Sequence, residues 1–97
     1  MIGRRLKEAR KLKKMSQEKL GLEAEMEIST ARSRISQYEN DAVNPPFELV
    51  CKFADVLGMP ESYFYTRDDA FAEKILSLYR IETEGRSDNK KSKKRAD

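Results

Sequence analysis

Three short stretches decide the fold of this chain of 97 residues: Met15-Ser16-Gln17-Glu18-Lys19-Leu20, then Ile35-Ser36-Gln37-Tyr38-Glu39-Asn40, then Asn44-Pro45-Pro46. Ser16 is a good N-cap, because its hydroxyl can accept a backbone N–H of the first turn, so a helix is predicted to start at Gln17. The prolines must interrupt a helix, because proline lacks an N–H and disfavours helical geometry in the residue before it. The order and spacing of these stretches indicate two successive helices suited to a DNA groove.

Apolar residues at helical spacing predict a helix on either side of this pair. Residues 4–14 form a short amphipathic pattern with one narrow face: Leu6, Ala9, Arg10 and Lys13. The helix from Gln17 has an apolar face of Leu20, Ala24 and Met26. The next helix is predicted from Thr30, with Ala31, Ile35 and Tyr38 pointing inward.

The C-terminal half continues in the same way. One apolar stripe predicts the main core helix, which should end at Gly58 because glycine readily adopts the left-handed conformation that terminates helices. The stripe consists of Phe47, Val50, Phe53, Ala54 and Leu57. Pro60 can open a short helix through Tyr65, and Asp68-Asp69 place negative charge at the start of a further helix. That last helix carries Phe71, Ile75, Leu78 and Tyr79. With no strand alternation and no internal repeat, the predicted fold class is all-α.

Composition narrows the function. A content of 38% hydrophobic residues allows one compact core but no catalytic domain with a deep cleft. The apolar runs are too short to cross a bilayer and the N-terminal residues lack a signal-peptide segment, so we expect a cytoplasmic protein that binds no membrane. The chain has no histidine and no Gly-rich phosphate loop, and its single Cys51 lies within an apolar helix pattern. We therefore expect no enzyme, metal or cofactor.

Charge is distributed unevenly. Residues 1–14 hold seven Lys/Arg and one Glu, residues 85–97 hold six Lys/Arg and two Asp, and residues 15–84 carry seven basic and fourteen acidic side chains. Basic ends favour phosphates, although a solvated amphipathic helix and a disordered tail would have the same composition. The outer face of the helix from Thr30 has no acidic side chain and carries residue types that hydrogen-bond base edges in the major groove: Thr30, Arg32, Ser33, Ser36 and Gln37.

Together these segments resemble the Cro/phage-repressor type of helix-turn-helix domain, the XRE family. The resemblance covers Ile2 to Tyr65 and rests on ordered motifs: Arg4 to Arg10, Ser16 to Leu20, Arg32 to Asn40, Asn44-Pro45, Phe53 to Pro60 and Tyr63-Phe64. It implies a five-helix, lambda-repressor-like DNA-binding domain at residues 1–66. We then expect an additional helix at 67–84, for packing or dimerisation, and a disordered basic tail at 85–97.

The resemblance also implies roles for single residues. Gln17 would bind a phosphate and brace the recognition helix, and Asn40 and Asn44 would hold the DNA backbone. Arg32, Ser33 and Gln37 occupy positions where the family usually touches bases, with Thr30 and Ser36 beside them. Arg10 and Glu39 match an arginine and a glutamate that family members often pair as a structural ion pair.

The sequence departs from the family between the two central helices. Residues 23–30 are longer than the usual tight turn, so either the turn is enlarged or the recognition helix begins early. Their three glutamates would repel phosphate, and we expect them to face away from the duplex. Asp41 stands where a glycine is common, although Asn40-Asp41 can still form a turn.

The predicted partner is double-stranded DNA with a pseudo-palindromic site. The apolar stripe of the last helix favours a homodimer over internal packing, which would place two recognition helices about 34 Å apart. We expect a transcriptional regulator, and a repressor in particular, because occupying a site needs no further domain. The alternative is a helical protein-interaction module such as an antitoxin-like partner binder. The sequence does not identify a small-molecule effector.

Overall fold

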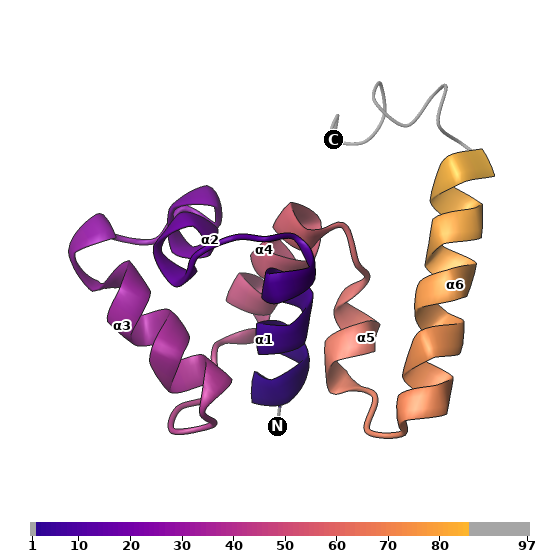
Figure 1. The fold of residues 1–97 in the computed structure, drawn as a ribbon, viewed down its shortest axis with the longest axis horizontal. Coiled ribbons are helices and arrows are strands. Elements are labelled where there is room, and N and C mark those ends of the chain that lie inside the picture. The colour runs from indigo at the N-terminus through magenta and orange to yellow at the C-terminus, as the bar shows by residue number, and fades with distance from the viewer. Residues whose placement is uncertain (1, 86–97) are drawn as a thin grey trace.

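The computed structural model describes residues 2–85, which form six helices. They are α1 (Gly3–Leu12), α2 (Gln17–Glu23), α3 (Ile28–Glu39), α4 (Phe47–Leu57), α5 (Glu61–Tyr65) and α6 (Asp69–Gly85). Figure 1 shows α2 and α3 at one end of the molecule and α6 at the other, with α1, α4 and α5 between them. The all-α prediction is confirmed for the described range, whereas the predicted basic tail lies, apart from Gly85, outside it.

Several helix ends follow directly from local chemistry. The Ser16 hydroxyl accepts the Lys19 N–H at 3.0 Å, so the predicted start of α2 is confirmed. Gly58 ends α4 with φ at 70°, as expected of a left-handed terminator. Helix α1 ends at Leu12, two residues before the predicted limit, because Lys14 turns to φ 57°. Lys13, predicted on the inner face of that helix, is exposed.

The connection between α2 and α3 corrects one prediction. Helix α3 begins at Ile28 and not at Thr30, so the extra residues lengthen the helix as well as the turn. Glu25 adopts φ 68°, and the Met26 N–H donates to the Gly21 carbonyl at 2.9 Å, which closes the end of α2. Half-buried Met26 then packs against the core, so its burial fixes where α3 can start.

One hydrophobic core joins all six helices. Its largest fully buried side chains are Phe53, Phe64, Leu6, Leu20, Ile35, Leu57 and Val50. Helices α2 and α3 approach so closely that a Cβ placed on Gly21 would lie 2.6 Å from the Ala31 Cβ. Gly3 is similarly confined, since its Cβ would lie 2.4 Å from the Glu39 carbonyl oxygen. Two glycines therefore set the distances of α2 and α1 from α3.

Helix α6 packs through a different stripe from the predicted one. Ala72 and Leu76 are buried, Ile75 and Tyr79 are half-buried, and Phe71 and Leu78 are exposed. Because Ala72 is small, the side of α6 that carries it can lie close to the core. Phe71 and Leu78, on another side of the helix, then face solvent. Exposed Ile81 adds to this outer apolar face.

Buried Arg5 ties α1 to the start of α6. Its Nε donates to the Thr66 carbonyl at 2.8 Å. Its Nη2 donates to the Arg67 carbonyl at 3.1 Å and to the Asp69 carboxylate at 2.9 Å. Arg4 reaches the same Asp69 oxygen at 2.9 Å. These hydrogen bonds to arginine lower the pKa of the Asp69 carboxyl below its ordinary value.

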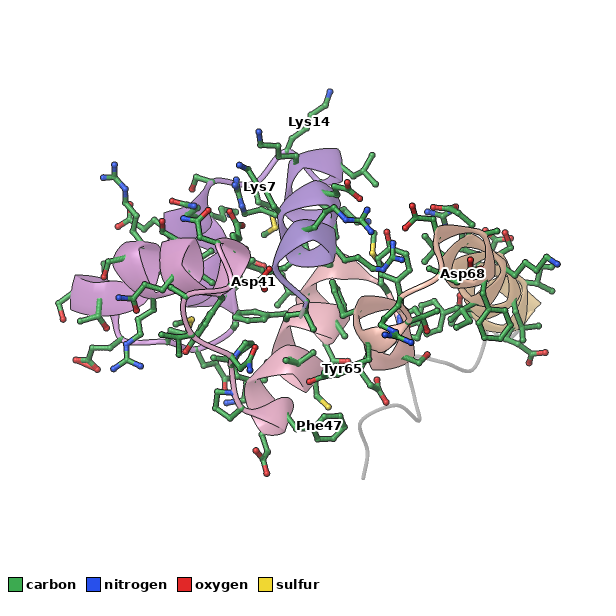
Figure 2. All side chains as sticks on the ribbon, turned by 90° about the horizontal axis from the view of Figure 1, so that it is seen from below. Lys7, Lys14, Asp41, Phe47, Tyr65 and Asp68 are labelled. Atoms are coloured by element: carbon green, nitrogen blue, oxygen red, sulfur yellow. The ribbon has the colours of Figure 1, made fainter. Side chains whose placement is uncertain are left out.

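Phe47 was expected in the core stripe of α4 and is 56% exposed instead. Its ring lies 6.2 Å from that of Tyr65, and Phe47 stands at the edge of the molecule opposite Lys14 (Figure 2). Among residues 2–85, no helix combines the length and apolarity needed to cross a bilayer.

Candidate nucleic-acid interface

The outer face of α3 is open to solvent. Arg32, Ser33 and Gln37 are exposed, Thr30 is exposed in the first turn, and Ser36 is half-buried. The Ser33 hydroxyl donates to the Thr30 carbonyl at 3.3 Å, whereas the Arg32 guanidinium makes no hydrogen bond or ion pair with residues 2–85. On the other side of α3, Ala31, Ile35 and Tyr38 are buried as predicted. Core packing therefore leaves the predicted base-contacting side chains free.

The start of α2 and the exposed face of α3 enclose two shallow hollows. One, of about 430 Å³, is lined by Arg10, Ser16, Gln17, Glu18 and Arg32. The other, of about 470 Å³, is lined by Gln17, Ser29, Arg32, Ser33 and Ser36. Gln17 and Arg32 border both hollows, so the structure joins two residues that are far apart in the sequence. Ser29 was not singled out from the sequence, because the predicted helix began after it.

Beneath these hollows lies a buried ion pair. Arg10 donates from Nε to Glu39 Oε2 at 2.6 Å and from Nη2 to Glu39 Oε1 at 3.1 Å, and the two side chains are 10% and 2% exposed. Arg10 Nη1 also donates to the Met15 carbonyl at 2.8 Å. Gln17 Nε2 donates to Glu39 Oε1 at 3.0 Å. The pair thus connects α1, the start of α2 and the end of α3.

This network orients Gln17 without using all of its donors. A glutamine amide carries two N–H donors, and the hydrogen bond to Glu39 accounts for one. The second can donate to an anion from a side chain that is already held in place. Pre-ordering lowers the entropy lost on binding, so this arrangement suits a phosphate contact.

The two asparagines lie at different places. Asn40 is exposed at the end of α3, and Asn44 is exposed in the loop before α4. Neither borders the hollows shared by Gln17 and Arg32, and Asn44 instead lines a pocket with Arg4 and Arg67. Between them Asp41 takes φ 60° and accepts the Gly3 N–H at 3.0 Å. Asp41 therefore adopts the left-handed turn where the family commonly has glycine, and also anchors the loop to α1.

Most of the glutamates at the connection between α2 and α3 have cationic partners. Of the three connecting glutamates, Glu25 reaches Lys52 on α4 at 3.0 Å and Glu23 reaches Lys19 within α2 at 3.1 Å. Lys7 on α1 and Lys14 in the turn after it have their ammonium groups outward (Figure 2). Two of these three glutamates thus have cationic partners on α2 and α4, while exposed Arg32 has none among residues 2–85.

Comparison with known proteins agrees with this geometry. The helix-turn-helix family profile matches residues 6–64, which is more than half of the chain. The chain belongs to the XRE-type helix-turn-helix family. The crystal structure of the transcriptional regulator BswR is similar to it, with a TM-score of 0.76 and 37% identity over 81% of this chain and 78% of that one. No curated protein sequence matches the chain.

Membership of the helix-turn-helix family, with the similarity to BswR, supports a DNA-binding regulator of transcription rather than an enzyme. The environment of Cys51 does not favour a cysteine nucleophile. The side chain is half-buried on α4, and burial, followed by the nearby carboxylates led by Glu61, raises the pKa of its thiol. A raised pKa leaves less of the thiolate that a cysteine nucleophile requires.

Proposed function

We propose that this helix-turn-helix protein is a sequence-specific DNA-binding repressor that reads the major groove with α3. The observation that carries the proposal is the solvent exposure of Arg32, Ser33 and Gln37 beside a pre-oriented Gln17. An α-helix fits the major groove, where arginine suits guanine and glutamine suits adenine. Thr30 and Ser36 flank these three residues and complete the reading face.

The proposed contacts divide by what they recognise. Base contacts by Arg32, Ser33 and Gln37 discriminate between sequences, whereas phosphate contacts by Gln17, Asn40 and Asn44 position the domain on any sequence. Loss of one good bidentate base contact costs about 1–3 kcal/mol at the matching base pair. Loss of a phosphate contact weakens binding to all sequences by a similar factor.

The test is selection of bound sequences from a random DNA pool, followed by affinity measurements on the enriched site. We expect Arg32→Ala and Gln37→Ala to lose affinity for that site and to relax the preference at single positions. Gln17→Ala should weaken binding without changing the preferred sequence. Arg80→Ala is the matched control, because Arg80 is exposed on α6, at the opposite end of the molecule from α3 (Figure 1).

Failure of the parent protein to enrich any sequence at low ionic strength would refute the proposal. It would also fail if Arg80→Ala and Arg32→Ala weakened binding equally with no change of sequence preference, because that result would indicate attraction by charge alone. Circular dichroism of each variant establishes that the helices remain.

We further propose a homodimer that binds a pseudo-palindrome, with residues 1–66 as the DNA-binding domain and residues 67–84 as the dimerisation element. Support comes from the outer face of α6, where Phe71, Leu78 and Ile81 are 56%, 59% and 65% exposed. Equilibrium sedimentation should give a dimer for the parent and a monomer for Leu78→Glu. A monomeric parent at tens of micromolar would exclude this arrangement.

The same apolar face favours a second candidate function, an interaction module that binds another protein through α6. A face with three large exposed apolar side chains on one helix suits a helical or grooved partner. If Leu78→Glu leaves DNA affinity intact while Arg32→Ala abolishes it, DNA binding is the function of α3 and α6 serves a separate contact. Parent protein without any DNA affinity would favour the interaction module.

A further inference from the structure

A pocket of about 400 Å³ lies between the start of α1, the loop before α4 and the connection from α5 to α6. It is separate from the two hollows beside α3, because none of its lining residues borders either of them. Its volume is within the range of small-molecule sites, about 300–1,000 Å³. Its lining combines cationic groups with apolar and aromatic groups.

Three arginines supply the cationic side, and no acidic residue is among those that line the pocket. Arg5 is buried and held by the Thr66 and Arg67 carbonyls and by Asp69. Arg4 is also bound to Asp69. The Arg67 guanidinium has no hydrogen bond or ion pair with any residue from 2 to 85. One cation at the pocket therefore has its donors free, next to two that are fixed in position.

The apolar side is formed by Ile2, Phe64 and Tyr65. Ile2 and Phe64 are buried with 4% and 2% of their surface exposed, so the pocket reaches the edge of the core. Tyr65 is 47% exposed, and its other neighbour is the ring of Phe47. The Tyr65 hydroxyl is uncharged at neutral pH already at its ordinary pKa, and burial raises that pKa further.

We propose that this pocket binds a small organic anion with an aromatic body and a carboxylate group. The flat apolar part lies against the exposed ring of Tyr65, and the carboxylate accepts hydrogen bonds from the Arg67 guanidinium. A guanidinium presents two parallel N–H donors that match the two oxygens of a carboxylate. An inorganic phosphate would meet the same cations but would leave the aromatic wall in contact with water.

Occupation of the pocket has a consequence for DNA binding. Asn44 lines the pocket and belongs to the same loop as Asp41, which is hydrogen-bonded to Gly3 at 3.0 Å. A ligand that contacts Asn44 competes with the DNA backbone for this side chain and lowers DNA affinity. This consequence rests on the proposed DNA binding, whereas occupation of the pocket does not, so ligand binding is measured without DNA.

The experiment is a titration of the full chain with 2-naphthoate, followed by amide shifts in two-dimensional NMR spectra. We expect saturable shifts centred on Ile2, Tyr65 and Arg67. Neutral 2-naphthalenemethanol lacks the carboxylate, and inorganic phosphate lacks the aromatic body. Both should therefore bind on the order of tenfold more weakly than 2-naphthoate. Binding of phosphate as tight as that of 2-naphthoate would overturn the proposal.

Two pairs of variants locate the site. Arg67→Gln should weaken 2-naphthoate binding about tenfold, the size of one charge-assisted hydrogen bond, while Arg80→Gln on α6 removes the same charge elsewhere and should have no effect. Tyr65→Ser should weaken binding, and Phe71→Ser should not. Equal effects within each pair, shifts confined to α6, or no saturable shift at millimolar 2-naphthoate would each refute the pocket as the binding site.

Discussion

Removing one partner of the Arg10–Glu39 pair should strongly destabilise this domain. In Arg10→Met, Glu39 loses two of its three hydrogen bonds and keeps only that from Gln17. In Glu39→Gln, Arg10 loses the one carboxylate partner that it has among residues 2–85 and keeps the bond to the Met15 carbonyl. Each single variant leaves a charge that is at most 10% exposed without its counter-charge.

The magnitude follows from this burial. Leaving one charge of a buried pair alone costs about 3–5 kcal/mol, against a total stability of about 5–15 kcal/mol for a domain. With a urea dependence of about 1.5 kcal/mol per M, a loss of 3 kcal/mol lowers the unfolding midpoint by about 2 M. The double variant has no uncompensated charge, so it should lose no more than either single variant. The resulting coupling energy is about 3 kcal/mol.

The assay is urea unfolding followed by circular dichroism at one fixed protein concentration, since any self-association would alter the apparent stability. The control cycle uses Lys19→Met and Glu23→Gln, an exposed pair at 3.1 Å within α2 that should couple by less than about 0.5 kcal/mol. Additive losses from Arg10→Met and Glu39→Gln, or single losses as small as those of the control, would refute the reasoning.

The other predictions concern separate parts of the fold. Gly21→Ala should destabilise the domain by about 1–3 kcal/mol, because its Cβ meets that of Ala31 at 2.6 Å, and adding Ala31→Gly should restore stability in urea unfolding. Because the pKa of Asp69 is lowered in the folded state, its ionised carboxylate stabilises the fold above the ordinary carboxyl pKa, and this contribution is lost as pH falls through the folded-state pKa. The amide shifts of α6 should therefore change at acid pH. A titration that leaves these shifts unchanged would contradict this prediction. Since burial raises its pKa, Cys51 should react with iodoacetamide more slowly at pH 7 than after unfolding in urea, and equal rates would contradict it.

Features that depend on a few neighbouring residues were predictable. The N-cap at Ser16 and the terminator at Gly58 are local, and the structure confirms both. The buried side of α3 was also predictable, because Ala31, Ile35 and Tyr38 repeat at the helical period. Once that side is buried, the polar residues between these positions must face solvent.

Features that depend on distant residues were not predictable in the same way. The start of α3 at Ile28 depends on how Met26 packs against the core. The orientation of α6 depends on Ala72 and Leu76, and its polar anchor at Asp69 on two arginines more than sixty residues away in the sequence. No periodicity within a single helix contains this information.

What the amino-acid order alone determined is the number and kind of helices and the chemistry on the outer side of α3, since capping and apolar repeats act over a few residues. Only the tertiary structure decided that Gln17 and Arg32 border the same hollows, that Asn44 lies in a pocket with Arg4 and Arg67, and that Phe71 and Leu78 face outward. These relations follow from close packing of the helices, which depends on contacts between residues far apart in the chain.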